Sequence, residues 1–145
     1  MFQIKVECVL NKNIETVFNA ITDHGNYKQF PGINKSKLIV EGKNEKNGEG
    51  ALRIIGAGLF EFTERITCFE RANKMHYHIE ATSPISIRHD KGEITLVEMG
   101  EKTRVLWLSK GHMKVPIIGG ALDKLVEFQV SRVFRAILNH IEQGS

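Results

Sequence analysis

Long apolar runs, a signal sequence and cysteine motifs are missing from this chain of 145 residues. No stretch reaches the roughly 18 consecutive apolar residues that a membrane-spanning helix requires. Residues Met1 to Lys5 alternate between apolar and polar side chains and lack the charged and apolar regions of a secretory signal. The two cysteines, Cys8 and Cys68, form no CxxC pair. These absences predict a reduced, cytoplasmic protein and leave the redox role of either thiol open.

Sequence motifs of several large enzyme classes are also absent. The chain contains no GxSxG nucleophile elbow, no phosphate-binding P-loop and no HExxH zinc motif. Gly56-Ala57-Gly58 lacks the third glycine and the following helix of a dinucleotide-binding loop. His76 and His78 share one face of a predicted strand, but no third ligand accompanies them. We therefore expect neither a metal nor a cofactor.

The chain carries little excess charge, with a formal net charge of +3. No dense stripe of Lys and Arg interleaved with aromatic residues is present, so we expect no nucleic-acid partner. The densest basic cluster comprises Lys35, Lys37, Lys43 and Lys46. It is interpreted as an exposed hairpin or, alternatively, as a contact surface for a partner protein. The length predicts one domain over residues 1–145, as a monomer or a homodimer.

Apolar periodicity indicates the order of the structural elements. Residues 2–10 alternate as a half-buried strand, and Asn13 is a suitable N-cap for a short helix that ends near Asp23. A second short turn, Asn26 to Phe30, stops before Pro31. Six strands are then expected near residues 34–42, 50–56, 59–70, 74–83, 85–98 and 102–112. The pair Asn47-Gly48 is typical of a two-residue hairpin turn.

The last segment has a helical period from Gly119 to Gln143. An apolar stripe runs along one face of this predicted helix and includes Leu122, Val126, Gln129, Val130, Val133, Ile137 and Ile141. A stripe of that length must be buried against another element, and the predicted sheet is the only one available.

This order of elements resembles the helix-grip fold of the START-like superfamily, also called SRPBCC, which includes polyketide cyclases and dehydrases. The resemblance covers residues 2–141. The matching residues are Thr16-Val17-Phe18, Ile21, Asp23, Tyr27, Phe30-Pro31, Gly48-Glu49-Gly50, Glu64-Arg65-Ile66, Tyr77, Pro84, Gly92 and Thr103-Arg104-Val105-Leu106-Trp107.

The resemblance implies an α+β fold. In it a curved, seven-stranded antiparallel sheet wraps around the long C-terminal helix, and two short helices follow the first strand. It also implies a cavity between the sheet and the long helix, open near the short helices. Members of the superfamily bind lipids, sterols, polyketides, quinones or hormones, and a few catalyse cyclisation or dehydration.

Strand alternation identifies the side chains expected to face the long helix. In the strand near residues 59–70 these are Phe60, Phe62, Glu64, Ile66 and Cys68. This mostly apolar and aromatic set suits either a pocket for a small hydrophobic molecule or a filled core. The candidate ligand-binding residues are Tyr27, Phe30, Phe60, Phe62, Glu64, Tyr77, Ile79, Val105, Trp107, Leu122, Val126 and Val130.

Glu64 is the exception on this inward face. A buried carboxylate costs several kcal/mol unless it is paired or protonated. Glu64 is therefore an acid/base candidate together with Tyr77, or a hydrogen-bond anchor for a ligand hydroxyl. The alternatives are an ion pair with an arginine such as Arg53, or a position at the wet rim. A one-residue bulge would also reverse its facing.

Three segments have two interpretations each. Tyr27, Phe30 and Pro31 either border the cavity mouth or fill the core beneath the short helices. His24 either contacts a polar head group near the mouth or lies in solvent at the end of a helix. Residues 115–120 either gate the pocket or simply turn into the long helix.

Three functions remain open for the chain. The first is binding or transport of a small hydrophobic molecule without catalysis. The second is a cyclase or dehydratase that uses Glu64 and Tyr77 as acid/base groups. The third is a partner-binding module that makes its contact through the basic cluster at Lys35 to Lys46.

Overall fold

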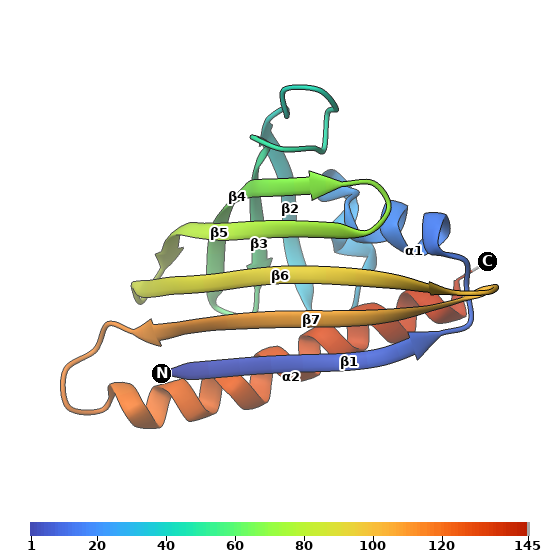
Figure 1. Ribbon diagram of the computed structural model, residues 1–145. Coiled ribbons are helices and arrows are strands. Elements are labelled where there is room, and N and C mark those ends of the chain that lie inside the picture. The colour runs from blue at the N-terminus through green and yellow to red at the C-terminus, as the bar shows by residue number, and fades with distance from the viewer. Residues whose placement is uncertain (145) are drawn as a thin grey trace.

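Seven antiparallel strands form one curved sheet in the order β1-β7-β6-β5-β4-β3-β2 (Figure 1). The computed structural model describes residues 1–144. Strands β1 to β7 span Phe2–Leu10, Ile33–Val40, Leu52–Ala57, Phe60–Glu70, Lys74–Ser83, Ile87–Met99 and Lys102–Met113. The predicted α+β helix-grip architecture is confirmed, and the strand ranges expected from the sequence differ from these by a few residues at their ends.

Two short helical elements connect β1 to β2. Helix α1, Ile14–Ile21, begins at the expected cap, where the Asn13 side chain accepts a hydrogen bond from the backbone N–H of Thr16 at 2.9 Å. Its apolar face is buried. The 3-10 helix η1, His24–Gln29, follows and packs beside β2. These elements close one end of the concave side of the sheet.

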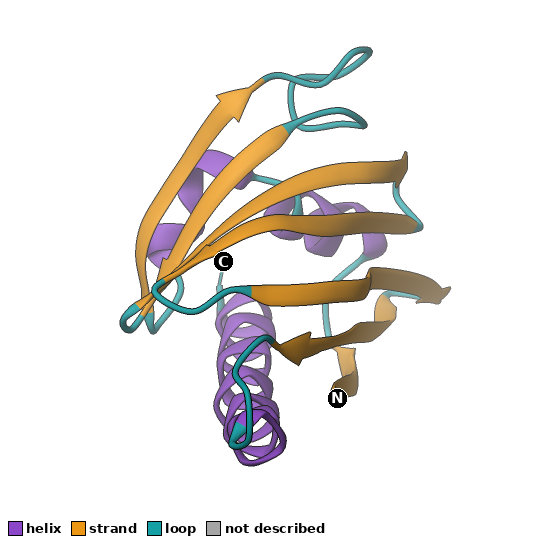
Figure 2. Cartoon of the chain, turned by 90° about the vertical axis from the view of Figure 1, so that its left-hand side faces the viewer, coloured by secondary structure: helices purple, strands orange, loops and turns teal. Residues whose placement is uncertain are grey.

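Helix α2, Gly119–Gln143, crosses the concave side and packs mainly against β1 and β7. Figure 2 views this helix end-on, with the sheet curving around it. Its last turns are buried through Ile137, Leu138 and Ile141, whereas the apolar side chains of its first turns are half-buried or exposed. Gln129, expected on the buried stripe, is exposed. No helix within residues 1–144 is both long and apolar enough to cross a membrane.

Two turn and register expectations are wrong. Asn47-Gly48 does not form a two-residue hairpin, because it lies in the long loop between Val40 and Leu52. Cys68 does not point inward, because the register of β4 against β5 shifts between Ile66 and Cys68. This bulge places Cys68 opposite the outward-facing His76, and Phe69 packs on the core in its place.

Strands β5 and β6 diverge after a short shared ladder. They pair only at Lys74–Thr95, Met75–Ile94 and His76–Glu93. Farther along, the His89 side chain fills the space between them: its Nδ1 accepts a hydrogen bond from the Ile79 backbone N–H at 3.1 Å. Nε2 of the neutral imidazole therefore carries the proton and faces Ser109 Oγ at 3.3 Å. A side chain thus takes the place of part of the β5–β6 ladder.

Candidate functional site

A buried ion pair joins the neighbouring strands β3 and β4. Arg53 on β3 and Glu64 on β4 are directly opposite each other in the ladder. Arg53 Nε donates to Glu64 Oε1 at 2.8 Å, and Arg53 Nη2 lies 2.7 Å from the same oxygen. The two residues are 2% and 7% exposed. Of the alternatives considered for Glu64, the structure therefore contains the ion pair with Arg53.

Burial alone lowers the pKa of the Arg53 guanidinium, but the adjacent Glu64 carboxylate and Tyr27 outweigh it and raise that pKa above its ordinary value. The Arg53 guanidinium therefore remains charged in the interior. Breaking such a pair by removing one partner leaves an uncompensated buried charge.

His24 extends this ion pair toward the loop after β2. Arg53 Nη1 lies 3.0 Å from His24 Nδ1, and His24 Nε2 lies 2.8 Å from the carbonyl oxygen of Asn47. Because arginine has only donors, Nδ1 accepts and Nε2 donates, so the imidazole is neutral. Burial and then the charge of Arg53 lower the His24 pKa to about 3. His24 is fully buried, so it neither lies in solvent nor borders a mouth.

Two tyrosines enclose the Arg53 side chain. The guanidinium carbon lies 4.9 Å from the ring centroid of Tyr27 and 5.7 Å from that of Tyr77. The Tyr27 hydroxyl donates to the Ile21 carbonyl, which ties the ring to the end of α1. The Tyr77 hydroxyl accepts a hydrogen bond from Trp107 Nε1 at 3.0 Å. Burial, followed by the nearby Glu64 charge, raises the pKa of Tyr77 above its ordinary value.

One oxygen of this cluster remains available. Glu64 Oε2 has no hydrogen-bond partner within residues 1–144, although every fully shielded side-chain nitrogen or oxygen in that range has one. Oε2 therefore keeps accessible surface, and the Glu64 side chain is 10% exposed. A carboxylate oxygen in this position can accept a hydrogen bond from a ligand hydroxyl or amine.

Half-buried apolar side chains lie on both sides of the space between the sheet and α2. We call this set the inner apolar layer. It contains Leu38, Ala57 and Phe62 from the sheet and Val126, Val130, Val133 and Phe134 from the helix. Trp107 and Phe134 join the two sides, with stacked rings whose centroids are 3.9 Å apart. The apolar surfaces of this layer are therefore only partly covered by the protein itself.

Apart from Glu64, the candidate ligand-binding residues divide into three groups. Tyr77, Ile79, Val105 and Trp107 are buried in the core. Phe60, Phe62, Leu122, Val126 and Val130 are half-buried. Tyr27 and Phe30 are each 2% exposed; their rings pack edge to face, and Phe30 also packs against His140 of α2. Tyr27 and Phe30 therefore fill the core beneath the short helices, which is the second of the two interpretations given for them.

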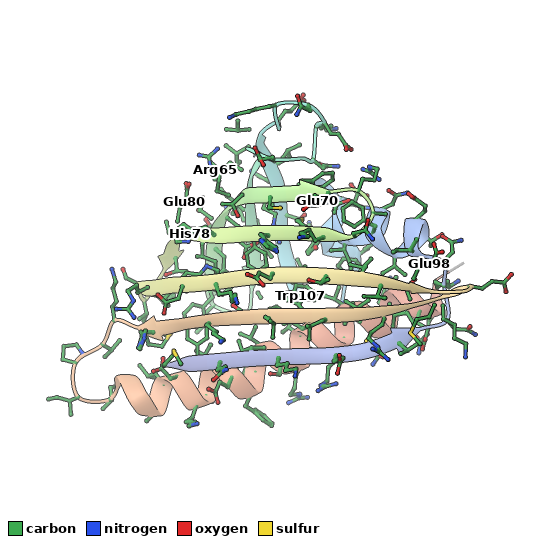
Figure 3. All side chains as sticks on the ribbon, in the orientation of Figure 1. Arg65, Glu70, His78, Glu80, Glu98 and Trp107 are labelled. Carbon is green, nitrogen blue, oxygen red and sulfur yellow. The ribbon has the colours of Figure 1, made fainter. Side chains whose placement is uncertain are left out.

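The convex face carries a different set of side chains. Arg65, His78 and Glu80 lie on this face (Figure 3), and Arg65 Nε is 3.1 Å from Glu80 Oε2. Within residues 1–144 no three His, Cys, Asp or Glu side chains are grouped as a metal site would require. Two surface hollows lie outside the inner apolar layer: one of about 550 Å³ between β1 and α2, and one of about 420 Å³ beside Asn11 to Asn13.

Sequence reasoning anticipated the inward Glu64 and, as one alternative, its arginine partner. It misplaced His24, which is buried, and assigned no role to His89. The signal for Arg53 is an arginine two residues before the buried Ile55 on a strand. No periodic signal identified the two histidines, because each occupies a break in regular structure: His24 at the start of a 3-10 helix and His89 beside a register shift in β6.

Comparison with known proteins agrees with this architecture. The chain aligns over 97% or more of its length with three solved structures, each over 93% or more of the other chain: a START superfamily protein from Mycobacterium smegmatis (14% identity, TM-score 0.77), a protein from Thermus thermophilus (17%, 0.77) and an aromatase/cyclase from a Streptomyces species (15%, 0.74). At these identities the likeness shows the fold alone. No curated protein sequence matches significantly.

A family model extends the agreement to the sequence itself. The model described as "Polyketide cyclase / dehydrase and lipid transport" matches residues 1–143, which is nearly the whole chain. The START-like fold, the curved sheet and the long C-terminal helix are all present in the structure. The chain therefore belongs to the polyketide cyclase / dehydrase and lipid transport family.

Proposed function

We propose that this protein binds a small, uncharged hydrophobic molecule that carries a hydrogen-bond donor, in the inner apolar layer between the sheet and α2. The observation that carries the proposal is the available Oε2 of Glu64 on the concave side, where the half-buried apolar side chains of the layer also lie. A few fixed polar atoms among apolar walls are the usual composition of a small-molecule site.

The electrostatics favour a donor-bearing ligand over an anionic one. Arg53 is 2% exposed, and its guanidinium already faces Glu64 and His24. It therefore offers no free donor to a ligand carboxylate. Of the two charged groups in the pair, the Glu64 carboxylate is the more exposed, and its negative charge repels an anion. A hydroxyl or an uncharged amine suits this site.

An acid/base role for Glu64 and Tyr77 is the second candidate. Both groups already hold partners: Glu64 accepts from Arg53, and the Tyr77 hydroxyl accepts from Trp107. The raised pKa of Tyr77 also leaves its phenol a weak acid near neutral pH. These contacts support a binding role more than proton transfer. The family description includes both kinds of activity.

Fluorescence titration with N-phenyl-1-naphthylamine, a neutral apolar amine, tests the proposal. The wild type should bind it, and 2-naphthol should compete better than 2-naphthoate. Val126→Phe places extra volume in the inner apolar layer and should weaken binding. Leu125→Phe, on the exposed face of the same helix, is the matched control and should bind like the wild type. Native mass spectrometry of the purified protein provides a second readout for a retained ligand.

Three results would overturn the proposal: no probe binding by the wild type, equal binding by the Val126 and Leu125 variants, or a preference for the carboxylate competitor. Turnover of a cyclase substrate that Glu64→Gln abolishes, with probe binding retained, would favour the enzymatic alternative.

A further inference from the structure

A patch of large apolar side chains lies on the surface around the start of α2. Ile117 is fully exposed, and Ile118, Leu125 and Phe128 are 54%, 51% and 62% exposed. Ile118 immediately precedes the helix, and Leu125 and Phe128 follow it by seven and ten residues, so the three fall on one helical stripe. The loop that carries Ile117 protrudes at one end of the molecule, at the lower left of Figure 1. Grouped exposure of this kind marks an interaction site.

Acidic and basic side chains of residues 114–135 lie on different sides of the segment. Between residues 114 and 135 both acidic side chains are engaged with the sheet. The Asp123 carboxylate is buried and accepts hydrogen bonds from the Met1 ammonium at 2.7 Å and the Met113 backbone N–H at 2.9 Å. Glu127 Oε2 accepts from the backbone N–H of Gln3 at 2.9 Å.

All four basic side chains of this segment are exposed: Lys114, Lys124, Arg132 and Arg135. Lys124 lies 3.6 Å from Glu127, and its side chain is 80% exposed. The outward surface of the segment is therefore apolar and cationic.

The hollow of about 550 Å³ brings the two kinds of side chain together. It lies between the edge strand β1 and α2. Its lining residues are Lys5, Lys124, Phe128, Arg132 and Arg135, together with Gln3, Glu127 and Ser131. The Arg132 guanidinium carbon is 5.7 Å from the centroid of the Phe128 ring. Phe and Leu beside Lys and Arg on a helix surface are typical of a helix that lies at a membrane interface.

We propose that this surface, comprising Ile117, Ile118, Leu125, Phe128 and the surrounding cations, docks on an anionic phospholipid membrane. The apolar side chains enter the headgroup region, and the cations contact lipid phosphates and anionic headgroups. A second copy of the chain is a poor occupant, because the same patch would bring like charges together. The docking surface is separate from the inner apolar layer and does not depend on the ligand proposed above.

Vesicle co-sedimentation tests the proposal with the full chain. Wild-type protein should sediment with vesicles of phosphatidylcholine mixed with phosphatidylserine, should bind pure phosphatidylcholine weakly, and should be released by added salt. Ile117→Asp with Phe128→Asp should lower the fraction bound by on the order of tenfold or more. Leu59→Asp, which removes a 91% exposed leucine elsewhere, is the matched control and should bind normally.

A charge-reversed pair separates the electrostatic part. Lys124→Glu with Arg132→Glu should lose binding to the anionic vesicles, whereas Lys43→Glu with Lys46→Glu, an equal charge change in the β2–β3 loop, should retain it. Circular dichroism melts confirm that each variant is folded, and probe binding to the inner apolar layer should be unchanged in all of them. Absence of wild-type binding, equal loss in the control pairs, or dimers in place of vesicle binding would overturn the proposal.

Discussion

Trp107 donates its indole N–H to the hydroxyl of Tyr77 at 3.0 Å, although β6 lies between the strands that carry them. Tyr77 extends over β6 at Gly92, where an added Cβ would lie 2.7 Å from the Tyr77 ring and 2.8 Å from the ring of His89. The missing side chain at Gly92 is thus what allows a contact between β5 and β7.

Gly92→Ala should lower the free energy of unfolding by about 1–3 kcal/mol, because the new methyl group must displace Tyr77 or His89. Urea denaturation followed by Trp107 fluorescence measures the change. Gly120→Ala is the matched control: no atom lies within 4 Å of the added Cβ, and alanine should stabilise the first turn of α2 by about 0.4–1 kcal/mol. Equal stabilities for the two variants would contradict this account of Gly92.

The buried and the exposed arginine–glutamate pairs should contribute different amounts to the free energy of unfolding. Glu64→Gln leaves the Arg53 guanidinium without a countercharge in the interior and should cost about 3 kcal/mol of stability. Glu80→Gln removes the exposed partner of Arg65, on a neighbouring strand, and should cost about 0–1 kcal/mol. Chemical denaturation of both variants provides the comparison. A Glu64→Gln protein as stable as Glu80→Gln would show that the buried charge is accommodated in another way.

Stability should fall in mild acid because two histidines are buried in their neutral form. Burial and the Arg53 charge lower the pKa of His24 to about 3, and burial followed by His78 lowers that of His89 to about 4, both from 6.5. Between pH 6.5 and 4 the unfolded chain therefore binds protons that the folded chain does not. Each histidine then costs up to about 1.4 kcal/mol per pH unit.

Urea midpoints measured across this pH window test the two histidines. His89→Gln retains an acceptor for the Ile79 N–H but does not titrate, so its stability should depend less steeply on pH than that of the wild type. If the stability of His89→Gln depends on pH as steeply as that of the wild type, His89 does not contribute to the loss of stability in acid.

Ligand binding in the inner apolar layer should change the emission of Trp107, the only tryptophan. Its indole stacks on Phe134 of α2, so any displacement of the helix alters its surroundings. A spectral shift on addition of 2-naphthol that is lost in Val126→Phe is the expected result. An unchanged spectrum at saturation, established by an independent titration, would place the ligand elsewhere.

Periodicity in the sequence was sufficient to predict the element order and the bounds of α2, because a 25-residue helix and alternating strands leave strong apolar patterns. Glu64 was identifiable as a charge at an inward position, and Arg53 as a candidate partner. Cys68 was misplaced because a bulge adds one residue without changing composition. The burial of His24 and the position of His89 depend on contacts between distant segments, which no local pattern encodes.

The divergence of β5 from β6 divides the sheet into two parts that pack against different helices. Strands β1, β7 and β6 form one part, which contacts α2; strands β5 to β2 form the other, which contacts η1. Their ladder is limited to three residue pairs near His76, and the His89 side chain joins them farther along. Because few backbone pairs cross this line between β5 and β6, we expect it to open more readily than the longer ladders of the sheet. We expect a rotation along this line to change the width of the inner apolar layer while the contacts of α2 with β1 and β7 persist.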